Sequence, residues 1–154
     1  MSLGRGSGAD QPVTGPNDPS GGPVLIDTSL WIEALRTSGS AEARRAVAQA
    51  VEPGLALVNG LIVTELLRGA RDAAELERLA LLLDATTSVP LEERTWRRAA
   101  HLGFEMRRVG VIVPTVDLVI AACALEAGVT LLHMDPHFEL VASHCALRQV
   151  FVGG

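Results

Sequence analysis

Four acidic residues stand next to, or inside, strongly apolar segments of the chain. Asp27 follows the run VLI, Asp117 follows VIVPTV, Asp135 follows VTLLHM, and Glu65 interrupts GLIVTELLRG. A carboxylate is costly to bury unless it is hydrogen-bonded, paired or bound to a cation. Carboxylates that share one site repel one another, and a divalent cation that takes their oxygens as ligands removes this repulsion. Metal-dependent chemistry therefore requires a fold that brings these side chains together.

Each carboxylate taken alone also fits a local structural role. Asp27 suits an Asx turn, Asp117 suits the start of a helix, where the dipole favours an anion, and Asp135 before a proline suits a turn. Glu65 suits an ion pair with Arg68 or Arg71 on a solvated helix face. These roles and a shared site remain alternatives until the elements that carry the residues are placed.

Short apolar segments alternate with helical segments from residue 24 onward. The predicted strands cover residues 24–26, 55–58, 87–90, 129–134 and 147–151. The predicted helices cover residues 30–35, 42–51, 60–68, 73–85, 91–110, 116–127 and 137–144, and three of them have a predicted N-cap in Ser29, Asn59 and Thr115. Apolar strands separated by helices predict a parallel sheet covered on both faces. The expected fold is an α/β three-layer α/β/α sandwich with a central, mostly parallel sheet of about five strands.

The predicted sheet gives the carboxylates a common location. Ligands of open parallel sheets bind beyond the carboxyl ends of the strands. Asp27 and Asp135 directly follow predicted strands, Asp117 lies at the start of a predicted helix at the same rim, and Glu65 lies on a helix that can face this rim. The arrangement predicts a site for Mg²⁺ or Mn²⁺, which prefer hard oxygen ligands.

Composition excludes several other classes of protein. The formal net charge is −5 and all 13 basic residues are Arg, which argues against a general electrostatic nucleic-acid binder and excludes a catalytic lysine. No apolar run approaches the roughly 18 residues of a membrane span, and no signal peptide is expected. Cys123 and Cys145 form no disulfide framework, which favours a reducing, cytoplasmic setting. Residues 1–23 are predicted to be a flexible leader and 24–154 the folded domain.

Four segments resemble, in order, the motifs of the PIN-domain ribonuclease family: VLIDTSLWIEALR, VTELLRGARD, PTVDLVIAACALEAG and LLHMDPHFELVA. More narrowly, they resemble the VapC-type toxins of bacterial toxin–antitoxin pairs. The resemblance implies a PIN-like nuclease domain over residues 24–154 that cleaves RNA. It also implies a cognate antitoxin protein as partner, and a homodimer or a toxin–antitoxin hetero-oligomer.

The resemblance also assigns roles to residues of this chain. Asp27 and Asp117 are the expected inner ligands of Mg²⁺ or Mn²⁺, and Glu65 and Asp135 complete the catalytic, metal-binding pocket. The metal would activate a water molecule and stabilise the charge that develops on the phosphate.

Three further residues are expected to bind substrate. Thr28 and Ser29 follow the first aspartate of the site, and simple helix capping is the alternative role for them. Arg68 is an expected contact of the RNA backbone, together with Arg36, Arg71 and the group Arg94, Arg97 and Arg98.

Two features depart from the family pattern. His133 stands where the family usually has a threonine, two residues before the last aspartate, and the leader precedes the expected start of the domain. His133, Asp135 and His137 in HMDPH therefore leave open a His/Asp zinc metallohydrolase as an alternative. A non-catalytic, degenerate PIN or receiver-like binding module is the other alternative, although a receiver needs a lysine that the chain lacks.

Overall fold

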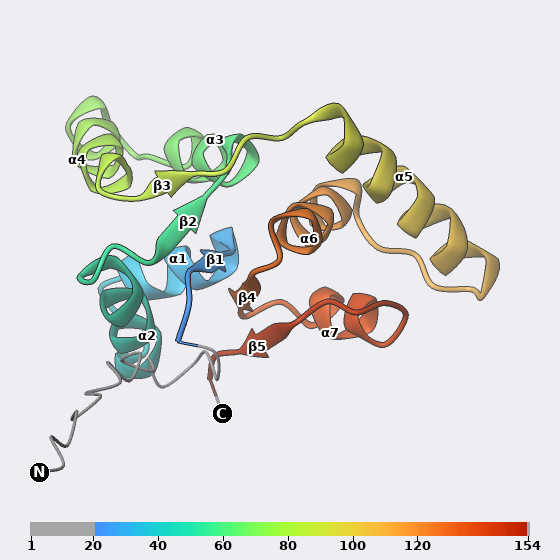
Figure 1. The fold of residues 1–154 in the computed structure, drawn as a ribbon. Coiled ribbons are helices and arrows are strands. Elements are labelled where there is room, and N and C mark those ends of the chain that lie inside the picture. Colours follow the sequence, from blue (N-terminus) through green and yellow to red (C-terminus); the bar gives the residue numbers. More distant parts are fainter. Residues whose placement is uncertain (1–20, 154) are drawn as a thin grey trace, which may run out of the picture.

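The computed structural model describes residues 21–153, which fold around one five-stranded sheet (Figure 1). Its strands are β1 (Val24–Ile26), β2 (Ala56–Val58), β3 (Thr87–Ser88), β4 (Thr130–His133) and β5 (Gln149–Phe151). All neighbouring strands are parallel, in the order β3-β2-β1-β4-β5. The predicted five-stranded parallel α/β fold is confirmed. Residues 1–20 of the predicted leader lie outside the described residues.

Seven helices connect the strands in the described part of the chain. They are α1 (Thr28–Leu35), α2 (Ala41–Val51), α3 (Gly60–Arg68), α4 (Ala73–Asp84), α5 (Glu93–Arg108), α6 (Thr115–Ala127) and α7 (Pro136–Ala142). Figure 1 shows α1–α4 with β2 and β3 in one half of the molecule and α5–α7 with β4 and β5 in the other. The chain builds outward from β1 in one direction through β2 and β3, and then returns to β4 on the other side of β1.

This return makes the gap between β1 and β4 the topological switch point of the sheet. Val24, Leu25 and Ile26 of β1 pair with Thr130, Leu131 and Leu132 of β4. Open α/β sheets bind ligands in the crevice beyond the carboxyl ends of two such strands, because the connections leave them in opposite directions. Asp27 and Asp135 follow these two strands.

The strands β1 and β2 are fully apolar, as expected for strands that helices cover on both faces, whereas the edge strand β3 is polar and exposed. Leu25, Ile26 and Leu131 are completely buried, together with Trp31 of α1 and Ile120 of α6. Helix α6 is buried along most of its length and packs on α5, α3 and α7. Cys123 is one of its buried residues, as predicted. No helix in residues 21–153 is both long enough and apolar enough to cross a membrane.

Two of the predicted helix caps are wrong. Asp27, not Ser29, caps α1, and its carboxylate accepts a hydrogen bond from the Ser29 backbone N–H. Helix α6 begins at Thr115 itself, after Pro114, without a side-chain cap. The prediction for Asn59 is confirmed, because its Oδ1 accepts from the Ile62 backbone N–H at 3.0 Å. Both errors have the same cause. The helices begin one or two residues before their predicted starts, so the polar residue predicted as the cap lies inside the helix.

Candidate active site

The four predicted carboxylates converge at the switch point. Asp27 lies beyond β1 and Asp135 beyond β4, while Asp117 is in the first turn of α6 and Glu65 in the second turn of α3. The electrostatic influence of Asp27, Asp135 and Glu65 reaches Asp117 and raises its pKa. Glu65 and Asp135 likewise raise the pKa of Asp27. Residues separated by up to 108 positions in the chain therefore share one electrostatic environment.

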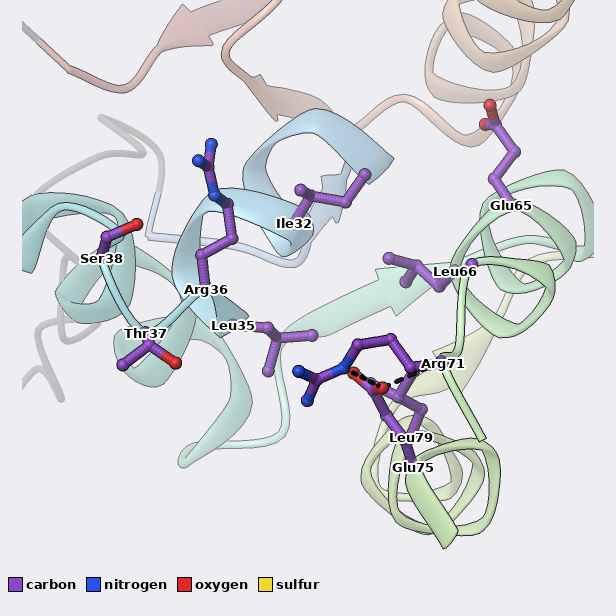
Figure 2. A pocket seen from close by; sticks show the side chains of 11 residues that line it. Ile32, Leu35, Arg36, Thr37, Ser38, Glu65, Leu66, Arg71, Glu75 and Leu79 are labelled. Atoms are coloured by element: carbon purple, nitrogen blue, oxygen red, sulfur yellow. Dashed lines mark hydrogen bonds and ion pairs between the residues drawn. The ribbon is translucent and has the colours of Figure 1, made fainter. Parts of the chain in front are cut away.

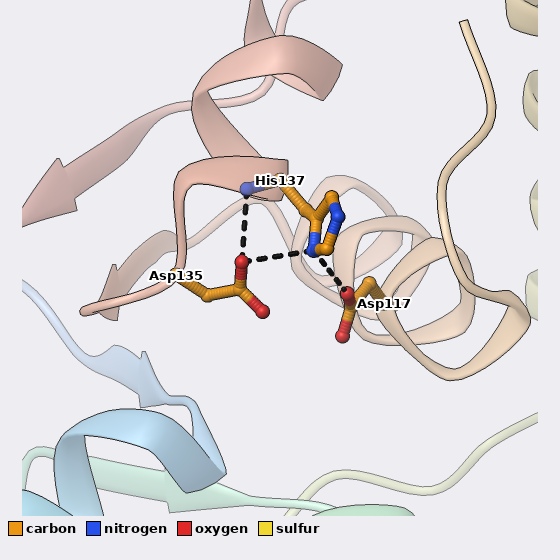
Figure 3. A group of neighbouring side chains, drawn as sticks. All are labelled: Asp117, Asp135 and His137. Carbon is orange, nitrogen blue, oxygen red and sulfur yellow. Dashed lines mark hydrogen bonds and ion pairs between the residues drawn. The ribbon is translucent and has the colours of Figure 1, made fainter.

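Asp117, Asp135 and His137 form the tightest cluster of this environment (Figure 3). One ligand atom from each of these residues lies within 4.8 Å of the others. His137 Nδ1 is 3.2 Å from Asp117 Oδ2 and 2.9 Å from Asp135 Oδ1. The angles at this buried nitrogen do not suit a hydrogen bond with either carboxylate. Two carboxylate oxygens and an unsatisfied imidazole nitrogen therefore face one small space.

Asp27 is held by the residues at the start of α1. Its side chain is buried, with 4% of the residue exposed. Its Oδ2 accepts hydrogen bonds from the Ser29 backbone N–H at 3.0 Å and from the Ser29 hydroxyl at 2.5 Å. The same hydroxyl accepts from the backbone N–H of Met134, directly after β4, at 3.0 Å. Ser29 thus connects the ends of β1 and β4 and orients the Asp27 carboxylate.

Glu65 reaches the site from α3. The Thr28 hydroxyl donates a hydrogen bond of 2.9 Å to Glu65 Oε1, which joins α1 to α3. The alternative ion pair between Glu65 and Arg71 is absent among the described residues, because Arg71 pairs with Glu75 at 2.8 Å. Both hydroxyls predicted to contact substrate, those of Thr28 and Ser29, therefore contact the carboxylates of the site.

Burial and the neighbouring carboxylates raise the pKa values of Asp117 and Asp27. Burial, followed by the charges of Asp135 and Asp27, raises the pKa of Asp117 from 3.8 to about 6, although His137 opposes this rise. Burial also raises the pKa of Asp27, against the two hydrogen bonds from Ser29. Within residues 21–153, His137 is the one basic side chain within 4.0 Å of these carboxylates, and it lies next to Asp117 and Asp135.

This donor set suits a small divalent cation. Carboxylate oxygens are the ligands that Mg²⁺ and Mn²⁺ prefer. A bound cation would offset the repulsion between these partly buried carboxylates. The unsatisfied His137 nitrogen adds a ligand of the kind that Mn²⁺ tolerates better than Mg²⁺. Sequence reasoning left His137 out of the main site, although its position two residues after Asp135 was a usable signal.

The predicted zinc alternative named the wrong ligand set. His133 is completely buried, and neither of its ring nitrogens is free for a metal. Its Nδ1 accepts a hydrogen bond from the Asp135 backbone N–H at 3.1 Å, and its Nε2 is 2.6 Å from Gln149 Oε1. The third member of the cluster with Asp135 and His137 is Asp117, not His133. Pro136 begins α7 directly after Asp135, which ends the extended geometry that the zinc alternative required.

The arginines predicted to bind RNA differ in their surroundings. Arg94, Arg97 and Arg98 form ion pairs with Glu92, Glu93 and Glu126, so this group is electrically balanced. Arg36 pairs with Glu33 at 3.5 Å. Arg68 is exposed at the end of α3, three residues after Glu65, and has no ion pair among the described residues. Residues three apart lie on the same side of a helix, which places Arg68 near the site.

An apolar pocket adjoins the site between α1, α3 and α4 (Figure 2). Its volume is about 470 Å³, and Ile32, Leu35 and Leu66 point into the same space. The ion pair of Arg71 and Glu75 lines another part of its wall. Glu65 is the one member of the carboxylate group that also lines the pocket. A segment bound in this pocket would end next to the carboxylates.

Comparisons with known proteins agree with this geometry. The PIN domain family matches residues 24–143 of the chain. VapC ribonuclease Mb1587 from Mycobacterium bovis is 32% identical over 124 residues, which cover 77% of this chain and 91% of the relative. Ribonuclease VapC18 from Mycobacterium tuberculosis is 30% identical over 122 residues, which cover 77% of this chain and 86% of the relative.

Solved structures share the fold at lower sequence identity. The crystal structure of VapBC2 from Rickettsia felis, bound to a DNA fragment from its promoter, gives a TM-score of 0.71 at 15% identity, with 84% of this chain and 98% of that chain covered. FitAcB from Neisseria gonorrhoeae gives a TM-score of 0.69 at 18% identity, with 82% and 95% covered. The family match, the VapC relatives and the shared fold lead to one conclusion: the chain belongs to the PIN-domain family, within its VapC ribonuclease branch.

Proposed function

We propose that the protein is an Mg²⁺- or Mn²⁺-dependent endoribonuclease and acts as the toxin of a toxin–antitoxin pair. The observation that carries the proposal is the convergence of Asp27, Glu65, Asp117 and Asp135 at the switch point of the sheet. The chain keeps all four carboxylates that the family resemblance predicts. A degenerate PIN module that only binds its ligand would not need to retain this repulsive arrangement.

The four carboxylates have different roles in the proposed site. Asp117 and Asp135 offer ligand atoms within 4.8 Å of each other, and His137 contacts both carboxylates. Asp27 contributes the third carboxylate, oriented by Ser29. A bound divalent cation supplies a more acidic water molecule and stabilises negative charge on the scissile phosphate. Glu65, held by Thr28, faces the same space and orients water near the phosphate.

RNA must approach an acidic site, so the phosphate backbone needs a local positive contact. Arg68 supplies this contact, since it is exposed three residues after Glu65 and forms no ion pair with any residue between 21 and 153. Aromatic residues make up only 3% of the chain, which leaves little capacity for base stacking. Recognition therefore depends on RNA shape and backbone contacts, in the reducing cytoplasmic setting that the cysteines favour.

The proposed antitoxin occupies the apolar pocket beside the site. Solved structures that share this fold include a toxin–antitoxin complex from Klebsiella pneumoniae. Ile32, Leu35 and Leu66 offer apolar contacts, and Glu65 at the end of the pocket attracts a basic side chain of the partner. An antitoxin segment bound there blocks the carboxylates. The proposed assembly is a homodimer of the toxin or a hetero-oligomer of toxin and antitoxin.

Cleavage of RNA by the purified protein tests the proposed activity. The protein is incubated with a mixed cellular RNA in Mn²⁺, in Mg²⁺ and in EDTA, beside the Asp117→Asn variant as a matched control. Specific cleavage that needs either cation and is lost in the variant supports the proposal. Cleavage that survives EDTA, or that Asp117→Asn retains, contradicts it. Binding of RNA without cleavage under all conditions identifies the non-catalytic module instead.

A further inference from the structure

His133 is a completely buried polar residue that the proposed chemistry does not use. It is the last residue of β4, two positions before Asp135. Its ring nitrogens have different partners: Nδ1 accepts from the Asp135 backbone N–H at 3.1 Å, and Nε2 is 2.6 Å from Gln149 Oε1. Because the backbone N–H is always a donor, Nδ1 carries no proton and Nε2 carries the single proton of the neutral ring. Gln149 Oε1 is the matching acceptor.

Packing holds this ring in one orientation. The His133 ring meets Phe138 of α7 edge-on, with 5.0 Å between ring centroids. It meets Phe151 of β5 in the same manner at 5.6 Å. Phe151 pairs with His133 across the parallel strands, and Gln149 lies two residues earlier on the same face of β5. One hydrogen bond and two aromatic contacts therefore direct Nδ1 toward the chain that follows β4.

We propose that His133 is a positioning residue that fixes the backbone of Asp135 and thereby aims its carboxylate at the metal site. The inference rests on the proposed function, since it concerns a ligand of the same site. His133 does not touch the metal. It acts on the turn between β4 and α7, and Gln149 keeps its ring in the required tautomer.

In the turn that carries Asp135, each backbone N–H from Met134 to His137 donates to a side chain, except at Pro136, which has no N–H. Ser29 Oγ accepts from the Met134 backbone N–H, and His133 Nδ1 accepts from the Asp135 backbone N–H. Asp135 Oδ1 then accepts from the backbone N–H of His137 at 2.9 Å, which caps α7. Loss of the His133 contact leaves the Asp135 backbone N–H without its hydrogen-bond acceptor, so the backbone that directs this carboxylate toward Asp117 and His137 is held less firmly. Removal of such outer contacts weakens metal binding in other proteins.

The tautomer of His133 provides the first test, on the metal-free wild-type protein. Two-bond ¹⁵N–¹H correlation spectra at neutral pH distinguish the two nitrogens of each imidazole. We expect His133 to show a protonated Nε2 and an unprotonated Nδ1. A protonated Nδ1 overturns the proposal, because that atom could no longer accept from Asp135. This test needs no variant that might disturb folding.

A pair of variants separates the hydrogen bond from packing. His133→Asn keeps an oxygen acceptor near the position of Nδ1 and loses the group that contacts Gln149. His133→Gln keeps a donor near the position of Nε2 and loses the acceptor for Asp135. Both variants remove the imidazole ring from between Phe138 and Phe151, so they share the loss of packing. Melting temperatures of the apo forms measure that shared loss.

The deciding measurement is the affinity for Mn²⁺, obtained by calorimetry without RNA. We expect His133→Gln to bind Mn²⁺ at least roughly 10-fold more weakly than wild type, whereas His133→Asn stays close to wild type. If wild type and both variants bind Mn²⁺ with equal affinity, the positioning role of His133 is contradicted, but the proposed metal site is not. Weaker binding by His133→Asn than by His133→Gln also contradicts it. A wild type that binds no Mn²⁺ contradicts the proposed metal site itself, and the positioning role with it.

Discussion

The Thr28 hydroxyl donates a 2.9 Å hydrogen bond to Glu65 Oε1 and so connects two helices whose residues are 37 positions apart. Thr28 is the first residue of α1, directly after Asp27, and it is buried. Glu65 is the carboxylate of the site that comes from α3. This contact holds the Glu65 carboxylate beside the start of α1, where Asp27 lies.

Replacement of Thr28 by valine tests this contact. Thr28→Val keeps the shape of the side chain and removes the donor, so we expect kcat/KM for RNA to fall by roughly 10-fold to 100-fold. Stability should change by less than about 1 kcal/mol, since Glu65 is only half-buried and water can replace the hydroxyl. Thr28→Ser is the matched control and should retain activity. Equal activity of all three proteins shows that Thr28 does not orient Glu65.

Asp27 combines a structural and a proposed catalytic role, and two variants distinguish them. Asp27→Asn keeps an oxygen that can cap α1, but it removes a charge from the site. Its apo form should be at least as stable as wild type in urea, and it should not bind Mn²⁺ or cleave RNA. Asp27→Ala also loses the cap and should be about 1 kcal/mol less stable than Asp27→Asn. An Asp27→Asn protein that fails to fold assigns Asp27 a structural role instead.

Asp117 should make the stability of the apo protein depend on pH. The pKa of Asp117 in the folded state is about 6, above its ordinary value of 3.8, so the folded protein binds more protons than the unfolded chain between these values. The free energy of unfolding therefore falls as pH rises from about 4 to about 7, by up to roughly 3 kcal/mol. Asp117→Asn should lack this fall and be more stable than wild type at pH 7. Chemical denaturation at a series of pH values measures it.

A matched control for that experiment is Asp84→Asn, which alters an exposed aspartate at the end of α4, outside the site. This variant should follow the wild-type pH curve. Saturating Mn²⁺ should raise the melting temperature of wild type at pH 7 by mass action and leave Asp117→Asn nearly unchanged. A pH dependence that Asp117→Asn retains in full would place the responsible group elsewhere.

Arg68 should contribute to RNA binding and not to the chemical step. Arg68→Ala should raise KM and leave kcat nearly unchanged, because a phosphate contact made throughout the reaction is lost. The dependence of log K on log salt should become shallower by about 0.7 for a single-stranded substrate. Arg97→Ala is the control, since Arg97 is already paired with Glu93 at 2.6 Å. Identical effects of the two variants would argue against a specific role for Arg68.

The sequence predicted the architecture well because local patterns determine it. Apolar strands such as Val24–Ile26, helix ends such as Gly128 with its positive φ of 66°, and the Asn59 cap depend on residues next to one another. The location of Asp27 and Asp135 followed from their positions after strands. The convergence of these carboxylates then required only the topology of the sheet.

What escaped prediction depends on contacts between distant residues. The ring of His133 faces Gln149, 16 residues later, and no local pattern distinguishes this from a ring that faces the metal site. The group Arg94, Arg97 and Arg98 looked available for RNA until the fold brought Glu126 beside two of its members. The hydrogen bond between the Thr28 hydroxyl and Glu65 likewise joins residues 37 positions apart, whereas substrate contact by Thr28 and Ser29 stays a prediction.

The most direct test of the account is the position of Mn²⁺ in crystals of the protein soaked with the ion. Anomalous scattering identifies Mn²⁺ independently of the surrounding density. The account predicts one or two peaks at the carboxyl ends of β1 and β4, within about 2.0–2.3 Å of oxygens from Asp117 and Asp135 and adjacent to Asp27. The absence of a peak there at saturating Mn²⁺, or peaks only at distant surface carboxylates, would contradict the metal-dependent site.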